Sequence, residues 1–134
     1  DMKSKFDIGL ETRNAILCED QLDKVKKSIS VLDKDFQKFI TEYAWGDVWS
    51  DPKLSKRERS MLTLAILASQ GNHDELKLHI AACKNTGTSP GDMIATMMHV
   101  AIYAGLPKAN LAIKLIKEET KKKVSEALKV AKLL

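Results

Sequence analysis

The sequence has few aromatic residues and no long apolar segment. Phe, Trp and Tyr make up 5% of its 134 residues, and strand-like alternation is hard to find, which disfavours a β-sandwich or barrel. The longest nearly apolar run, residues 61–68, is far shorter than the roughly 20 residues of a transmembrane helix. Residues 1–7 are charged and lack the apolar centre of a signal peptide. We therefore expect a cytoplasmic protein with no membrane partner.

Cysteine is scarce as well. Cys18 and Cys83 lie far apart and form no C-x-x-C motif, which disfavours a redox pair or a zinc cluster. We expect both thiols to be reduced and buried. The sequence also lacks a P-loop, a dinucleotide-binding fingerprint, a nucleophile elbow and an HExxH motif. His73 and His79 lie on different faces of one expected helix, so we expect no metal site.

The net charge of +4 is concentrated near the carboxyl end. Residues 117–132 contain six lysines and three glutamates, whereas the rest of the chain is close to neutral. No aromatic residues are interleaved with this basic stretch, and such a stretch is usually the solvated face of a helix. We therefore expect no nucleic-acid partner.

The apolar pattern predicts an all-α protein. Hydrophobic residues make up 44% of the chain, and their helical spacing predicts one domain over 1–134 with about seven helices and a basic end at 117–134. The expected helices cover 3–18, a short segment from 20, 30–46 with Gly46 as the end, 55–70, 73–86, 89–105 and a segment from 107. Residues 60–70 are apolar on nearly every side and belong at the centre of the core. Apolar surface is left over, which predicts a homo-oligomer.

Glu75 and His79 form the most distinctive polar pair. They are four positions apart, which places both side chains on one face of the helix 73–86. A carboxylate beside an imidazole orients the ring and raises its pKa, which favours proton transfer near neutral pH. The alternative is an ordinary surface pair that stabilises the helix by roughly a few tenths of a kcal/mol.

Four other residues are candidates, each with a simpler explanation. Glu58 completes an S-x-x-E capping box with Ser55, which needs no catalysis. Arg59 is suited to clamp a carboxylate, although arginines in a first helical turn are usually solvated. Trp45 is expected to anchor the following loop or to wall a pocket. His99 lies on the methionine-rich helix 89–105. We expect it to be buried in the protein core or to face the pocket that Trp45 would wall.

Most of the chain resembles the carboxymuconolactone decarboxylase family. The resemblance is carried by residues 36–87, FQKFITEYAWGDVWSDPKLSKRERSMLTLAILASQGNHDELKLHIAACKNTG. It continues through HVAIYAGLPKAN at 99–110 and reaches back to Arg13 in GLETRNAIL. The blocks occur in order at the expected distances, so the resemblance is specific. It implies an all-α fold and a homo-oligomer, a ring-shaped hexamer or a trimer.

The helix that carries His79 separates two chemistries of this wider family. Alkylhydroperoxidase-type members carry C-x-x-C-x-x-x-H and use a thiol pair. Counting back from His79, the two cysteine positions hold Asn72 and Glu75 here. Without sulfur at either position the peroxidase mechanism lacks its nucleophile. The resemblance therefore favours the decarboxylase branch.

That branch implies a reaction that needs no cofactor. 4-Carboxymuconolactone, a lactone dicarboxylate, loses carbon dioxide to give 3-oxoadipate enol-lactone in the β-ketoadipate pathway of protocatechuate breakdown. Two other functions stay open: a thiol-dependent peroxidase of the same fold, which needs a reactive Cys83 or Cys18, and a non-catalytic oligomeric paralogue. The second is favoured by Asp51, which stands where many decarboxylases carry the arginine of W-x-R-x-x-L.

The resemblance also implies roles for the candidate residues. His79 would return the proton to the ring carbon, oriented by Glu75, and Glu58 would lie nearby as a second carboxyl group. The substrate would be held and enclosed by four further side chains: Arg13, Arg59, Trp45 and His99.

Overall fold

The computed structural model describes residues 2–133, and it confirms the predicted all-α fold. Seven α-helices and one π-helical segment form the regular structure of these residues, and no strand occurs among them. In chain order they are α1 Lys5–Ile16, α2 Glu19–Ser28, α3 Lys34–Ile40, η1 Thr41–Val48, α4 Lys56–Gln70, α5 His73–Thr86, α6 Pro90–Ala104 and α7 Leu106–Leu133. None of these helices combines the length and the apolar character that a membrane span requires.

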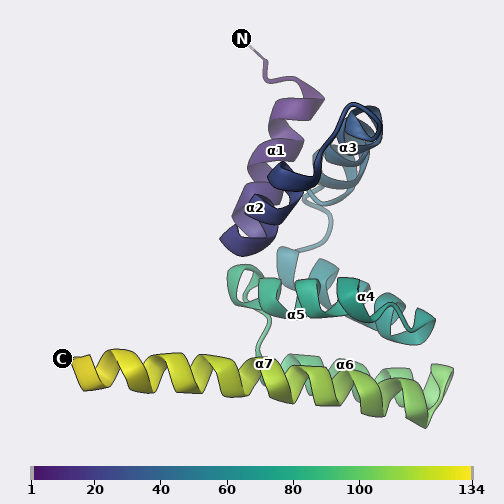
Figure 1. The fold of residues 1–134 in the computed structure, drawn as a ribbon. Coiled ribbons are helices and arrows are strands. Elements are labelled where there is room, and N and C mark those ends of the chain that lie inside the picture. Colours follow the sequence, from purple (N-terminus) through teal and green to yellow (C-terminus); the bar gives the residue numbers. More distant parts are fainter. Residues whose placement is uncertain (1, 134) are drawn as a thin grey trace.

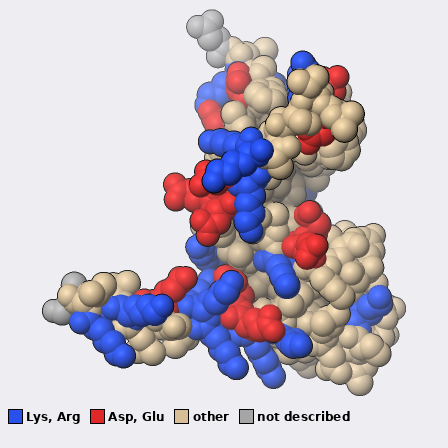
Figure 2. Space-filling model, in the orientation of Figure 1, with Lys and Arg blue, Asp and Glu red and all other residues tan. Residues whose placement is uncertain are grey.

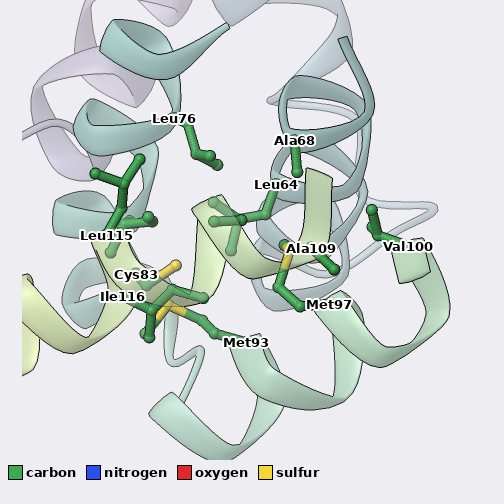
Figure 3. Packing of buried hydrophobic residues seen from close by; sticks show 12 residues of the cluster. Leu64, Ala68, Leu76, Cys83, Met93, Met97, Val100, Ala109, Leu115 and Ile116 are labelled. Atoms are coloured by element: carbon green, nitrogen blue, oxygen red, sulfur yellow. The ribbon is translucent and has the colours of Figure 1, made fainter. Parts of the chain in front are cut away.

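The helices are arranged in three layers (Figure 1). One layer contains α1, α2, α3 and η1, the next contains α4 and α5, and α6 with α7 forms the opposite side. The main core lies where α4, α5, α6 and α7 meet, and side chains from all four helices point toward one another there (Figure 3). Met93 and Met97 are buried in this core, as expected, whereas Met98 is exposed.

A smaller apolar cluster joins the first layer to α5. Its buried members are Ile16, Leu17, Trp45, Trp49 and Ala82. Because Trp45 belongs to η1, Trp49 follows directly after it and Ala82 belongs to α5, this cluster fixes the position of η1 above α5. That contact places the aromatic residues of the first layer beside the functional candidates of α5.

The helix that begins with α3 runs on into η1 and does not end at Gly46, so that prediction is wrong. The N–H of Trp49 donates to the carbonyl of Ala44 (2.8 Å), five residues earlier, as in a π-helix. Glycine is required at position 46 for close packing: a Cβ there would lie 2.6 Å from the carbonyl oxygen of Lys5. Gly9 is even more confined, since its Cβ would lie 1.9 Å from the carbonyl oxygen of Thr41. The two glycines allow the backbones of α1 and η1 to touch.

Capping explains where the next helices begin and end. The predicted Ser55–Glu58 capping box is present at the start of α4, and a second one opens α6. α4 ends at Gly71 in the left-handed conformation (φ 72°), which favours glycine. The chain then turns directly into α5, so α4 and α5 lie side by side beneath η1.

α4 is not buried on nearly every side, so that prediction is wrong for the single chain. Leu64 and Ala68 face the core, whereas Leu62 and Ile66 are 51% and 55% exposed on the opposite side of the helix. The far end of α7 extends past the other helices (Figure 1), and its basic side chains are exposed (Figure 2). The described chain therefore leaves apolar helix faces uncovered.

The contact of α1 with η1 predicts a large difference between two glycine-to-alanine substitutions. Gly9→Ala should lower the free energy of unfolding by at least about 2 kcal/mol, because the added methyl group overlaps a backbone carbonyl. Gly91→Ala, at a helical position where the nearest atom lies 3.6 Å away, should be neutral or stabilising by about 0.5 kcal/mol. Urea unfolding of both variants measures the difference. Equal stability of the two variants would contradict the close α1–η1 contact.

Candidate functional site

His79 lies beneath two stacked tryptophans. The imidazole is on the second turn of α5 and only 8% exposed. Its ring lies nearly parallel to that of Trp49, with centroids 5.9 Å apart, and 6.3 Å from that of Trp45. Trp45 and Trp49 stack on each other at 5.2 Å. The π-helical turn of η1 brings these two rings to the same side, over the face of α5 that carries His79.

This burial makes His79 a neutral imidazole at neutral pH. Removal from water lowers its pKa from 6.5 to about 4, because the charged form loses its hydration. Its Nδ1 is buried and has no hydrogen-bond partner among the described residues. The predicted rise in the pKa of His79 through Glu75 is therefore wrong. Glu75 is exposed and forms no hydrogen bond with the imidazole, because of these two residues only His79 is buried.

Two basic residues of α4 hold the segment that carries Trp49. Lys56 donates from Nζ to the carbonyl of Trp49, and Arg59 donates from Nη2 to the carbonyl of Asp51 (2.9 Å). The Nε of Arg59 is buried and unpartnered within the described chain. Burial, followed by the charge of Arg59, lowers the pKa of Lys56. Within the described residues, these two cations thus hydrogen-bond to backbone carbonyls of the Trp49 segment and to no side chain.

Glu58 and His99 lie together in a different place. They line a groove of about 450 Å³ between α4 and α6, with mainly apolar walls. The carboxylate of Glu58 accepts from the N–H of Ser55 (2.8 Å), and these bonds to Ser55 lower its pKa. His99 is exposed, with its ring 4.8 Å from that of Tyr103, so the prediction that it belongs to the core is wrong.

Arg13 lies in a third place. It is 9% exposed, and it lines a pocket between α1, α2 and α3 that neither His79 nor the tryptophans line. The structure thus brings together Trp45 and His79 with the loop held by Arg59, and separately Glu58 and His99. Three buried side-chain atoms of the described residues lack a hydrogen-bond partner, and all three belong to predicted site residues: Arg13 Nε, Arg59 Nε and His79 Nδ1.

The thiols are poorly placed for redox chemistry. Cys83 is fully buried in the main core (Figure 3), and burial raises its pKa to about 11. A thiol of this kind stays protonated and is a weak nucleophile. Cys18 is half-buried and donates to the carbonyl of Ala81 (3.5 Å). Residues 2–133 contain no group of three or more His, Cys, Asp or Glu side chains placed to hold a metal ion.

Comparison with known proteins identifies the family. The model of the carboxymuconolactone decarboxylase family matches residues 34–118. The chain belongs to this family. The match includes Trp45, Glu58, His79 and His99, whereas Arg13 lies before it.

Two relatives indicate the reaction class. The chain is 36% identical over 116 residues to 4-carboxymuconolactone decarboxylase from Acinetobacter baylyi, covering 87% of each protein. It is also 32% identical over 102 residues to nitrosuccinic acid decarboxylase npaB from Metarhizium robertsii, covering 76% of this chain and 71% of that protein. Both relatives are decarboxylases, in agreement with the predicted carboxy-lyase. The family's all-α fold agrees with the structure.

Sequence reasoning paired Trp49 with Trp45 as anchors of the loop, but it missed the stacking of the two rings and the contact of Lys56 with the loop. The four-residue spacing of Trp45 and Trp49 was the available signal, since it lets two rings stack along one helix face. That signal depended on continuing the helix past Gly46, which the glycine argued against. Lys56 carried no signal, because its contact with the Trp49 carbonyl arises from the fold of the loop.

The buried imidazole predicts a specific dependence of stability on pH. The pKa of His79 is about 4 in the folded protein against 6.5 as reference, so the unfolded chain takes up the proton first. The stability that this neutral histidine contributes is complete above pH 6.5 and is lost as the pH falls toward 4, by roughly 3 kcal/mol in total.

This loss is measured by chemical unfolding at pH 7.5 and 4.5. His79→Phe keeps an aromatic ring in the stack and removes the titration, so it should lose less stability than the wild type between these two values. His99→Gln, which alters an exposed histidine, should behave like the wild type. Identical pH dependence of His79→Phe and wild type would contradict the neutral, buried state of His79.

Proposed function

We propose that the protein is a cofactor-free carboxy-lyase that acts on a small dicarboxylate, with 4-carboxymuconolactone as the first candidate. The observation that carries this proposal is the set of unpartnered buried atoms. An unsatisfied buried polar atom costs about 1–3 kcal/mol. His79 packs against Trp49, Arg59 holds the carbonyl of Asp51 in the loop after Trp49, and each carries one such atom. A buried imidazole nitrogen and a buried guanidinium N–H that both lack a partner are groups that a carboxylate substrate would satisfy.

The reaction needs a place for an electron pair and a proton. In 4-carboxymuconolactone the bond to the departing carboxylate breaks, and its electron pair moves through the ring double bond to the lactone carbonyl. The resulting enolate takes a proton at the ring carbon next to that carbonyl. Donors that stabilise the developing oxyanion and a positioned acid are sufficient, so no cofactor is required.

We assign the proton transfer to His79, without a need for Glu75. With a pKa of about 4 the imidazole is neutral before the substrate binds. A bound dicarboxylate brings negative charge next to it, and nearby negative charge raises the pKa of an imidazole. The substrate would thus help to protonate the group that later donates to it. Arg59 would bind one carboxylate of the substrate. Its positive charge would also offset the negative charge of Asp51, which lies in the loop that Arg59 holds.

Access to His79 requires the covering loop to move. Five cavities of the described residues have neither His79 nor the tryptophans among their lining residues. The loop is held by Lys56 and Arg59 through backbone carbonyls. A carboxylate that competes for these two cations would loosen the loop and open the space beside the imidazole.

A second substrate class is suggested by the relative that acts on nitrosuccinic acid. That compound and 4-carboxymuconolactone each have two carboxyl groups and an electron-withdrawing group that can accept the electron pair. A nitro-substituted dicarboxylate is therefore the second candidate. The peroxidase alternative is disfavoured, because burial raises the pKa of Cys83 to about 11.

We also propose that the protein works as a homo-oligomer in the cytoplasm. The support is the exposed apolar face formed by α4 and α6, with Leu62, Ile66, Met98, Ile102 and Tyr103. A second chain covering this face would remove that surface from water. It would also enclose the groove that contains Glu58 and His99. A ring-shaped hexamer and a trimer both satisfy this requirement.

Turnover of 4-carboxymuconolactone by the purified protein tests the function. His79→Gln should reduce kcat by roughly a hundredfold or more, because a positioned acid contributes that much. Glu75→Gln should change it by no more than roughly twofold, the worth of a surface pair. A loss in Glu75→Gln as large as in His79→Gln would restore the pair predicted from sequence. Absence of turnover of both 4-carboxymuconolactone and nitrosuccinate would contradict the decarboxylase and favour a non-catalytic paralogue.

Glu58 can be tested without disturbing its helix. Glutamine is accepted at the third position of a capping box, so Glu58→Gln retains the cap and removes the acid. If Glu58 acts only as a cap, activity and free energy of unfolding should both stay close to wild type, within about 0.5 kcal/mol for stability. Ser55→Ala is the control for capping alone and should lower stability by about 1 kcal/mol. A kcat loss in Glu58→Gln with unchanged stability would instead assign it to catalysis.

A further inference from the structure

An apolar pocket with a buried cation lies between α1, α2 and α3. Its volume is about 340 Å³, which is within the range of small-molecule sites. Its walls are mainly aliphatic and include Leu10, Leu22, Val25 and Ile29. The family match begins at residue 34, so α1 and α2, which form most of the pocket, lie outside the matched segment.

Arg13 is the buried cation of this pocket. The side chain comes from α1, is 9% exposed, and has a pKa lowered by burial. The one hydrogen bond of its guanidinium within the described residues is a long contact from Nη1 to Thr41 Oγ1 (3.5 Å). Nε is buried and has no partner. A buried charge without a counter-charge is costly, so an anion bound here would be stabilised by Arg13.

The remaining charges at the pocket have the same sign. Lys26, Lys34 and Lys38 line it, and no acidic side chain of the described residues does. Lys38 forms a weak ion pair with Glu42 (3.8 Å), and the other two form none within the described chain. Basic side chains gather over α2 in Figure 2. The charged side chains at the pocket are therefore all positive, and Arg13 is the buried one.

The geometry of the Arg13 guanidinium and the aliphatic walls together indicate which class of ligand the pocket binds. A carboxylate is planar and singly charged, and it can accept from Nε and a neighbouring Nη of one guanidinium. The aliphatic walls favour an apolar body attached to that carboxylate. A phosphate is more strongly hydrated and would have to lose that water against the aliphatic walls. We infer that this pocket binds a small organic carboxylate with an apolar body, at a site separate from His79.

Binding of hexanoate and benzoate, measured by isothermal titration calorimetry on the full chain, tests this inference directly. Both acids should bind to the wild type, and hexanamide, which has the same length without the charge, should bind at least tenfold more weakly. Equal binding of acid and amide would overturn the role of the cation. Absence of binding by both acids would overturn the inference.

Four variants locate the site. Arg13→Gln should weaken hexanoate binding by roughly tenfold to a hundredfold, whereas the matched Arg57→Gln, whose guanidinium pairs with Asp92 on the surface, should not. Ile29→Trp, at an exposed position of the pocket rim, should block binding while leaving Arg13 and the fold in place. His79→Phe should bind like the wild type, which separates this site from decarboxylation.

Three results would count against the site. Equal loss in Arg57→Gln and Arg13→Gln would show non-specific attraction, and loss in His79→Phe would merge the pocket with the catalytic site. Full binding by a folded Ile29→Trp would place the ligand elsewhere. The pocket could instead be filled by a second copy of the chain. Light scattering of wild type and Ile29→Trp, each with and without hexanoate, tests this. Dissociation of the variant alone, with no effect of hexanoate, would show that a second copy occupies the pocket.

Discussion

Trp45 and Trp49 join the first layer of helices to α5 by stacking on each other and beside His79. Much of the structure serves this contact. The glycines at 9 and 46 let α1 press against η1, and the π-helical turn brings both indoles to the same side. Lys56 and Arg59 then hold the chain after Trp49 through its backbone carbonyls. Loosening any of these contacts would expose the imidazole to water.

The stack also creates the chemical character of the site. Large aromatic rings exclude water from His79, and this loss of hydration lowers its pKa to about 4. The rings offer the imidazole apolar contact and leave its Nδ1 unpaired. The burial of the indoles compensates for that unsatisfied atom, since each large aromatic side chain removes 150–250 Å² from water. Stability of the fold and readiness for a polar ligand therefore arise from one contact.

Much of the fold could be predicted from local sequence signals. Helix boundaries with a side-chain cap or a left-handed glycine, such as those at Ser55, Gly71 and Gly87, were predicted correctly because the cause lies within a few residues. Gly46 was misread as a helix end because the reason for a glycine there is close packing against the backbone of Lys5, which is far away in sequence. The exposed face of α4 was misread for a related reason, since an apolar helix does not reveal whether its second face meets its own chain or another one.

For the candidate residues, too, local features could be predicted from the sequence and tertiary placement could not. Sequence spacing correctly placed Glu75 and His79 on one helix, but spacing says nothing of how far the helix is rotated toward the core, and that rotation leaves one side chain in water and the other under the indoles. The resemblance named the candidate residues but could not divide them among sites. Their division into His79 with Trp45, Glu58 with His99, and Arg13 alone depends on tertiary packing.

The electrostatics favour a substrate that carries its own negative charge to the imidazole. A permanent carboxylate partner for His79, as Glu75 was expected to be, would keep its pKa high and the ring charged in the empty protein. With no such partner the ring stays neutral, and the empty site holds an unpaired Nδ1 next to a loop fixed by two cations. In the mechanism we propose, a dicarboxylate supplies the missing charge to both groups at once. Protonation of His79 would thereby be coupled to substrate binding, so the acid would exist when there is an enolate to receive its proton.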